Sequence, residues 1–392
     1  MTVLPLLALF ALDWFPRGLA PIDTGGGAVS AQACVGCHVT THAEWAKSRH
    51  GLAWTNAIFQ REYKDKPQDW CVHCHAPLAQ QLAEVHVGGG ALANEGVTCV
   101  ACHVRGGRMV ARTRADGSPH DTDARPDFGG PAWCGGCHQF NFPVVAQLPD
   151  GTPHVVRYTD RPMQDTEHQH ASGPRAATEC QTCHRTLRNT GHLFPGGHDA
   201  AFVRGALTVA TCRAGRAVDI TLANTGAGHN VPTGDLHRHL VLRAWHADAP
   251  EHLAEFLFGR RFEPDEAGGK RTVADTTIPA GETRRVRVPL AALGGDARAP
   301  LRVELRLVYT IDEFPFRGRE LAAPTFVTMF EDERRPATLP PCVDTIIVRK
   351  GGQNTFEDIH AALFPKKAPR PRTLTELKAG IADHLRRKHA RR

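Results

Sequence analysis

Methionine and long apolar runs are both scarce in this chain of 392 residues. The four methionines could supply sulfur ligands to few metal centres. The longest apolar run, residues 4–15, contains Asp13 and is shorter than the roughly 20 residues that a membrane-spanning helix needs. The sequence therefore predicts a mature protein that is soluble or peripheral to a membrane.

Cysteine, in contrast, is frequent and regularly placed. Ten of the twelve cysteines belong to five copies of the pattern Cys-x-x-Cys-His, in which two thioethers can hold one porphyrin and the histidine can bind the iron. A zinc site or a redox dithiol would explain a single copy, but neither uses a histidine after every cysteine pair. The pattern predicts five covalently attached haem c groups. The predicted attachment residues are Cys34, Cys37, Cys71, Cys74, Cys99, Cys102, Cys134, Cys137, Cys180 and Cys183, and the predicted proximal iron ligands are His38, His75, His103, His138 and His184.

The N-terminal segment, residues 1–33, is predicted to be a signal peptide. It combines the short apolar run with the small residues Ala31 and Ala33 just before the first motif. No Lys or Arg precedes the apolar run, so the true start codon stays open. Haem attachment and disulfides both belong outside the reducing cytosol, so the protein is expected in the periplasm or outside the cell.

The formal net charge of +6 arises in the C-terminal tail. From Lys366 onward the tail has ten Lys or Arg residues against Glu376 and Asp383, and the rest of the chain is slightly acidic. We interpret residues 351–392 as a basic tail that ends in a solvated helix. Contact with an acidic partner or an anionic membrane surface is the alternative for this tail, and nucleic-acid binding is not expected.

The haem motifs and the strand patterns occupy different parts of the chain. Residues 34–205 hold all five motifs with many Gly, Pro and His, which is typical of short helices and loops packed on haems. Residues 206–350 contain half a dozen alternating apolar and polar runs, which predict an antiparallel β-sandwich, with a barrel as the alternative. The predicted fold class is therefore α+β and multidomain. Its parts are a signal peptide (1–33), a pentahaem cytochrome c domain (34–205), a β-sandwich domain (206–350) and a basic C-terminal tail with a helix (351–392).

Histidine is the abundant source of second axial ligands. Of 23 histidines, five follow Cys-x-x-Cys pairs and 18 remain, whereas Met109 and Met163 are the methionines of the haem region. Most irons are therefore expected to carry histidine on both faces. His50 ends a predicted helix, His192 and His198 bracket a Pro-Gly turn, and His229 lies in a Gly-rich segment.

Several short segments follow one another in a recognisable order. The first motif is followed by Glu44-Trp45 and Ser48-Arg49-His50, and later come Gly96-Val97, Met163-Gln164-Asp165-Thr166, Phe194-Pro195-Gly196-Gly197-His198-Asp199 and Gly228-His229-Asn230-Val231-Pro232-Thr233-Gly234. This order resembles the multihaem cytochrome c family related to cytochrome c-554, over about residues 33–245. The resemblance implies electron transfer through closely packed haems, with distal ligands at His50, His120, His192, His198 and His229. The chain departs from relatives at Glu167-His168-Gln169-His170, so His168 or His170 could replace one of these ligands.

The leading hypothesis is a periplasmic or extracellular cytochrome that passes electrons along a row of bis-histidine haems. Its expected partners are redox proteins or quinol-linked donors. The alternative is an oxidoreductase of nitrogen compounds, of the nitrite or hydroxylamine type, which would need one open haem. Every motif ends in histidine and none in lysine, which favours a carrier over a catalyst. A further alternative is a subunit of an extracellular haem filament, in contact with neighbouring haem subunits.

Two cysteines, Cys212 and Cys342, lie outside the motifs. In an oxidising compartment, two leftover thiols near opposite ends of one domain are reasonable disulfide partners. The sequence alone does not bring their Cα atoms within bonding range, so this pairing is a hypothesis.

Overall fold

The computed structural model describes residues 21–25, 29–114, 117, 119–185, 190–266, 269–309 and 326–342. The basic tail and most of the expected signal peptide lie outside the described residues. The chain divides into two compact units, Met1–Pro340 and Pro341–Arg392, and the architecture below concerns the first. Among the described residues, no helix has both the length and the apolar character needed to cross a membrane.

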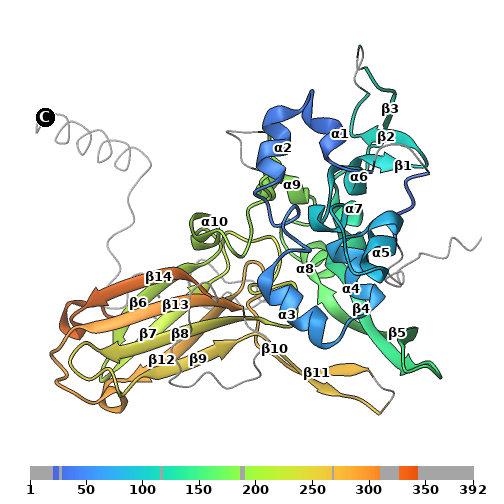
Figure 1. The fold of residues 1–392 in the computed structure, drawn as a ribbon. Coiled ribbons are helices and arrows are strands. Elements are labelled where there is room, and N and C mark those ends of the chain that lie inside the picture. The colour runs from blue at the N-terminus through green and yellow to red at the C-terminus, as the bar shows by residue number, and fades with distance from the viewer. Residues whose placement is uncertain are drawn as a thin grey trace, which may run out of the picture. The chain divides into compact units, whose positions relative to one another are not determined.

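Short helices, five of which carry the haem motifs, form the first part of this unit (Figure 1). The motif helices are α1 (Gln32–Val35), α4 (Asp69–His75), α6 (Cys99–His103), α7 (Pro131–His138) and α9 (Cys180–His184). Between and after them lie α2 (Val39–Trp45), α3 (Ala57–Asp65), α5 (Ala79–His86), α8 (Thr166–Ala171) and α10 (Ala200–Arg204). The helix predicted before His50 is confirmed as α2, although α2 ends at Trp45.

Strands also occur between the haem motifs, where the sequence shows little alternation. The strands β1 (Val104–Arg105), β2 (Arg108–Ala111) and β3 (Thr122–Ala124) form a small sheet, and β4 (Gln139–Gln147) pairs with β5 (Pro153–Asp165) in a long hairpin. The hairpin packs on a second one, β10 (Arg260–Pro264) and β11 (Lys270–Asp275), through Phe142 against Phe262 and through an Arg161–Asp265 ion pair of 2.7 Å. Contacts between distant segments thus stabilise these strands.

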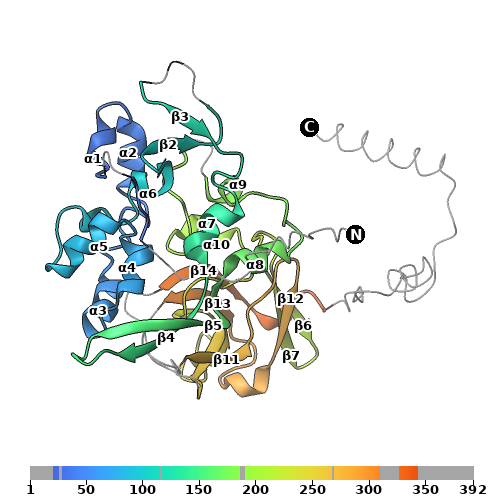
Figure 2. The ribbon, with the colours of Figure 1, turned by 90° about the vertical axis from the view of Figure 1, so that its right-hand side faces the viewer.

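The remaining strands form two antiparallel sheets around one core (Figures 1 and 2). One sheet has the order β12-β7-β6 and the other β14-β13-β8-β9. Ile220 and Leu222 of β7 face Leu242 and Leu305 of the other sheet, and all four side chains are inaccessible to solvent. The alternation of the sequence therefore gives the expected sandwich, and the α+β class is confirmed. The strand bounds are β6 (Thr208–Ala214), β7 (Ala217–Ala223), β8 (Arg238–His246), β9 (Ala254–Phe258), β12 (Thr283–Pro289), β13 (Leu301–Tyr309) and β14 (Phe326–Arg334).

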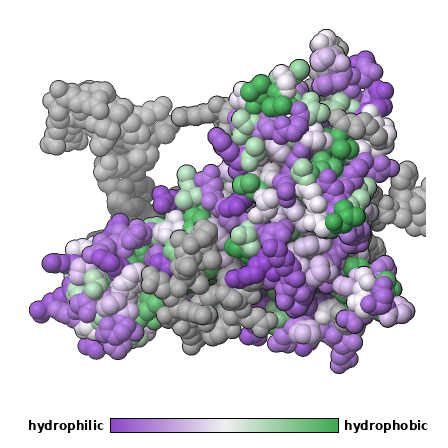
Figure 3. Space-filling model, viewed as in Figure 1, coloured by the Kyte–Doolittle hydropathy of each residue, from purple (hydrophilic) through white to green (hydrophobic). Residues whose placement is uncertain are grey.

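The apolar core is much smaller among the helices. The sandwich core contains twenty buried residues, whereas the two apolar clusters of the helical part contain four buried residues each, centred on Val72 and on Leu78. On the face drawn in Figure 3, hydrophobic residues reach the surface near α2 and α5. The helical part therefore has little apolar interior formed by its own side chains.

The segment just before the first motif is part of the fold. The backbone N–H of Ile22 donates to the carbonyl of Pro77 at 2.7 Å, and the buried Ala31 donates its N–H to the carboxylate of Glu95 at 2.7 Å. Cleavage at Ala33, as the sequence suggests, would remove both contacts. The disulfide hypothesis is confirmed, because Cys212 and Cys342 are both disulfide-bonded.

Candidate haem sites

Four of the five motif histidines face a second histidine that does not belong to a motif. The two ring centroids are 6.3 or 6.4 Å apart in every pair, although the partners come from different elements. The pairs are His38 with His120, His103 with His192, His138 with His50, and His184 with His229. Two imidazoles on opposite faces of one iron, with metal–nitrogen bonds of about 2 Å, place their centroids roughly 6 Å apart. The four pairs therefore fit a haem iron held from both sides.

Hydrogen bonds fix which ring nitrogen is available to the iron. The Nδ1–H of His103 donates to the carbonyl of Val110 at 3.1 Å, and that of His184 donates to Pro195 at 2.7 Å. On the opposite side, His229 Nδ1 lies 2.9 Å from the carbonyl of Asn230. A histidine whose Nδ1–H is bonded to a carbonyl presents the lone pair of Nε2 to a metal. These bonds thus prepare the rings for Nε2 ligation.

Burial favours the neutral form of five of the paired rings, which is the form that binds iron. It lowers the pKa of His50 and of His229 to about 4 and that of His138 to about 3. The rings reinforce one another, because after burial the neighbouring His50 lowers the pKa of His138 further. At neutral pH these imidazoles therefore carry no proton that a metal would have to displace.

Contacts between cysteines show which haem attachment points are neighbours. Cys34 of the first motif interacts with Cys99 of the third, Cys74 of the second with Cys137 of the fourth, and Cys134 of the fourth with Cys180 of the fifth. Burial and then Cys137 raise the pKa of Cys102 to about 11, which puts the third motif beside the fourth as well. The fourth motif thus lies next to three others.

The second motif differs from the other four. Its His75 donates Nδ1–H to the carbonyl of Ala53 at 2.8 Å, as a haem ligand should, and its ring lies flat on Phe59 with centroids 3.6 Å apart. Within the described residues, no other histidine ring faces His75. Burial lowers the pKa of His75, while the hydrogen bond to Ala53 and the carboxylate of Asp235 act in the opposite direction. No local pattern in the sequence indicates that the second motif differs.

Three histidines named from the sequence lie elsewhere. The ring of His198 packs on Tyr309 with centroids 4.0 Å apart, beside the positive charges of Arg49 and Arg238, and does not face a motif histidine. His168 lies 3.4 Å from the carboxylate of Asp165. His170 is buried beside Gly228, where an added β-carbon would come within 3.1 Å of its ring. The structure therefore brings together His50, His120, His192 and His229 with motif histidines, and not these three.

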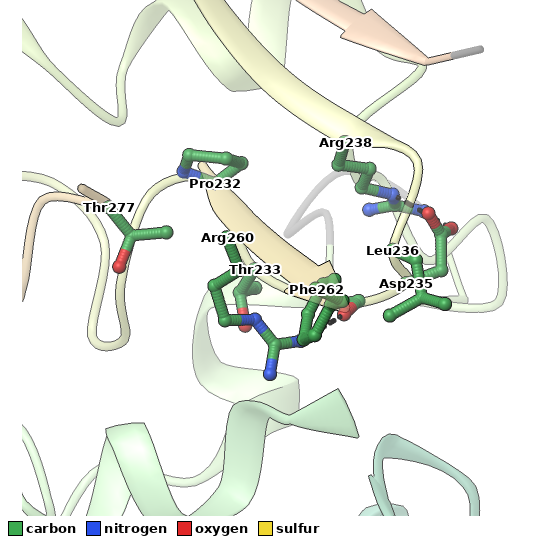
Figure 4. Close-up of a pocket in the computed structure, with 9 residues that line it drawn as sticks. Pro232, Thr233, Asp235, Leu236, Arg238, Arg260, Phe262 and Thr277 are labelled. Atoms are coloured by element: carbon green, nitrogen blue, oxygen red, sulfur yellow. Dashed lines mark hydrogen bonds and ion pairs between the residues drawn. The ribbon is translucent and has the colours of Figure 1, made fainter. Parts of the chain in front are cut away.

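A small pocket lies in the segment that follows His229 (Figure 4). Residues 232–236 and Arg238, Arg260, Phe262 and Thr277 line it. Arg238 reaches back to Asp235, with Nε 3.3 Å from the carboxylate. The pocket lining therefore includes a negative side chain, Asp235, and a positive one, Arg238. Asp235 is also the carboxylate that affects the pKa of His75.

Sequence reasoning missed the residues that support the ligands. Asp235 and Phe59 belong to no motif, and neither has a local signal that would single it out. Glu44 and Trp45 belong to the pattern that carries the family resemblance, and in the structure both residues anchor helix α2 to later segments of the chain. Such support depends on contacts between segments far apart in the sequence.

Repeated Cys-x-x-Cys-His motifs whose histidines face other histidines are typical of multihaem c-type cytochromes. The family described as cytochrome c554 and c-prime matches residues 33–104. The fold is similar to the crystal structure of a penta-haem cytochrome c552 from Thermochromatium tepidum, at a TM-score of 0.58 and 19% identity, over 78% of this chain and 98% of that one. No curated protein matches the sequence significantly. The chain is thus similar to that family over its first three haem motifs, and over most of its length it shares the fold of the penta-haem cytochrome.

Proposed function

We propose that this protein transfers electrons through five covalently attached haem c groups, four of which have histidine on both iron faces. The observation that carries the proposal is the spacing of 6.3 to 6.4 Å between four motif histidines and four other histidines. Bis-histidine iron has no free coordination position, so it exchanges electrons without binding a substrate. The donors and acceptors would be redox proteins or quinol-linked donors met in the periplasm or outside the cell.

The contacts between motifs favour a branched arrangement of haems over a single row. The first and third motifs are neighbours, and the second, third and fifth all adjoin the fourth. Electrons entering at the first haem would then pass through the third to the fourth. From the fourth haem they could move to either the second or the fifth.

The number and ligation of the haems can be measured on the intact protein. We expect the mass of the denatured chain to include five haems. The oxidised protein should show four low-spin irons and one high-spin iron, and carbon monoxide should bind about one haem in five after reduction. Replacing His229 by Ala should raise the carbon-monoxide-binding fraction to two in five, because His184 would lose its partner. If all five irons are low-spin and none binds carbon monoxide, the proposed coordination of the second haem is contradicted.

His198 provides the matched control for that substitution. It is a histidine near the haem motifs that packs on Tyr309 and faces no motif histidine. His198→Ala is therefore expected to leave all spin states as in the parent protein. A new high-spin iron in His198→Ala would instead assign His198 as a ligand.

A second candidate function follows from the second haem. Because no histidine faces His75 within the described residues, its iron would have an open face, which reduction of a small nitrogen compound requires. Reduced protein mixed with nitrite or hydroxylamine should then be reoxidised with consumption of the compound. A pure carrier would show no such turnover.

A neighbouring subunit that lends a histidine would also complete the second haem, as in a haem filament. In that case the fraction of iron that binds carbon monoxide should fall as the protein assembles. Sedimentation in parallel with the carbon monoxide titration separates this outcome from an open haem in a monomer.

A further inference from the structure

A buried carboxylate joins the helix after the first motif to the segment that carries His192. Glu44 of α2 is 9% exposed. Its Oε1 accepts the backbone N–H of Thr190 at 3.0 Å, and its Oε2 accepts the backbone N–H of His192 at 3.1 Å and the hydroxyl of Thr190. One side chain therefore holds two successive points of a segment that lies 146 to 148 residues later in the chain.

The segment held by Glu44 in turn fixes the ring of His192. The Nδ1–H of His192 donates to the carbonyl of Thr190 at 3.1 Å, and Gly191 between them has a φ of +80°, which favours glycine. This tight turn directs the imidazole toward His103, with ring centroids 6.3 Å apart. If the turn moved, the ring would move with it.

The same helix also contacts the segment on the other side of the third haem site. Trp45, next to Glu44, donates its indole N–H to the carbonyl of Val97 at 2.8 Å. Val97 lies two residues before Cys99, the first cysteine of the third motif, which interacts with Cys34 of the first motif. Helix α2 therefore reaches both the attachment side and the His192 side of the third haem site.

Glu44 keeps its negative charge in this position. Burial raises the pKa of the carboxyl group, but the hydrogen bonds from Thr190 and His192 act in the opposite direction and leave the pKa below its ordinary value. A carboxylate that accepts several N–H and O–H bonds is favoured in the ionised form. The third haem site thus has a fixed negative charge one hydrogen bond away from its second ligand.

We propose that Glu44 is a positioning residue for the iron ligand His192, and that through it helix α2, which follows the first motif, controls the coordination of the third haem. The inference rests on the proposed ligation of that haem by His192. It assigns Glu44 a role in the haem site although the carboxylate contacts the backbone of His192 and the backbone and hydroxyl of Thr190, and not the imidazole.

The first test is removal of the carboxylate in the full haem-loaded protein. Glu44→Ala leaves the two N–H groups without their acceptor, so the turn should loosen and His192 should leave the iron in part of the molecules. We expect additional high-spin signal from one haem and a higher carbon-monoxide-binding fraction than in the parent. Added imidazole should restore the low-spin signal, because it replaces the lost ligand.

A matched control is available in Glu95. This carboxylate also joins two distant segments, by accepting the N–H of Ala31 at 2.7 Å and the hydroxyl of Ser30, but these bonds involve no histidine. Glu95→Ala is expected to lower stability without adding a high-spin haem. Equal spin changes in both variants would show that any loosened segment has this effect, which would overturn the inference.

The second test retains the shape and removes the charge. In Glu44→Gln the amide oxygen can still accept one backbone N–H, so we expect all haems that are low-spin in the parent to stay low-spin. The midpoint potential of one haem should rise, because loss of a nearby negative charge disfavours the more positive ferric form. A purely structural role for Glu44 would leave that potential unchanged. If Glu44→Ala does not accumulate as a haem protein, the redox titration of Glu44→Gln decides by itself whether the inference holds.

His192→Ala separates this inference from the proposed function. If that variant shows no new high-spin haem, His192 is not a ligand and the proposed coordination of the third haem fails. If His192→Ala opens one haem while Glu44→Ala keeps it low-spin and Glu44→Gln keeps its potential, the coordination stands and the role of Glu44 is overturned.

Discussion

The helical part and the sandwich part of this chain are stabilised in different ways. In the sandwich, the side chains of two sheets fill the space between them, and Leu242 and Leu305 on neighbouring strands are inaccessible to solvent. In the helical part, the buried apolar groups are few and are divided between two clusters. Porphyrins are large apolar groups, so they can supply the interior that the helical side chains lack. The difference indicates that only the sandwich can fold without cofactor.

The largest effect is expected from the loss of one central haem. In a Cys134→Ala/Cys137→Ala double variant the fourth haem cannot attach, and its motif adjoins three others. We expect the helical part to lose protection against proteases while the sandwich retains it. Limited proteolysis with mass spectrometry of the fragments measures both at once. Equal protection of the two parts in this variant would show that the helical part does not depend on haem.

The disulfide should be the strongest single support of the sandwich. Replacing Cys212 and Cys342 by Ser opens a long loop, for which chain entropy predicts a loss of about 5 kcal/mol in the free energy of unfolding. Denaturant unfolding followed by the fluorescence of the sandwich should show this shift, and the haem absorbance should stay unchanged. A loss of haem ligation at the same denaturant concentration would mean that the two parts unfold together.

Removal of a core leucine should have a somewhat smaller effect. Leu305 is fully buried between the sheets, so Leu305→Ala is expected to lower the free energy of unfolding by about 2–5 kcal/mol. Val156 of the β4–β5 hairpin is 55% exposed, and Val156→Ala serves as the control with an expected change within about 0.5 kcal/mol. Similar losses from both substitutions would contradict the location of the core.

The smallest expected effect concerns the dependence of the free energy of unfolding on pH, at acidic pH. Hydrogen bonds from Arg287, together with the charge of Arg285, outweigh burial and hold the pKa of Asp219 below its usual value. A lowered pKa stabilises the fold above the unfolded value of about 3.9, and this contribution is lost as the pH falls through the lower folded pKa. Asp219→Asn should therefore cost about 1 kcal/mol at pH 6, and this cost should shrink as the pH falls below the unfolded pKa. Chemical unfolding at pH 6 and at successively lower pH values tests this, and a cost that does not shrink would contradict it.

The attachment residues and the sandwich strands could be predicted because their signals are local. A thioether pair needs two cysteines at fixed spacing, and a half-buried strand needs alternating side chains, whatever the rest of the chain does. The β4–β5 hairpin lacked such a signal, because its strands depend on Phe262 and Asp265 of another hairpin. Local patterns therefore predicted the elements that need no distant partner.

The choice of distal histidines shows where the local signal ends. His192 and His198 bracket the same Pro-Gly turn, and the sequence predicts both equally well as distal iron ligands. In the structure His192 faces His103, whereas His198 packs on Tyr309. A ring is directed by what surrounds it, and the groups that direct these two come from Glu44 in one case and from β13 in the other.

The sequence by itself determined where haem can be attached, because covalent attachment needs only a short motif and its immediate histidine. Only the tertiary structure decided which motif histidines face a second histidine, since the partners are brought together across long stretches of chain, as with His50 and His138. It also decided that His75 lies against Phe59 and near Asp235 with no facing histidine among the described residues. Coordination of an iron from both sides requires two rings at one distance, and that distance exists only once the chain has folded.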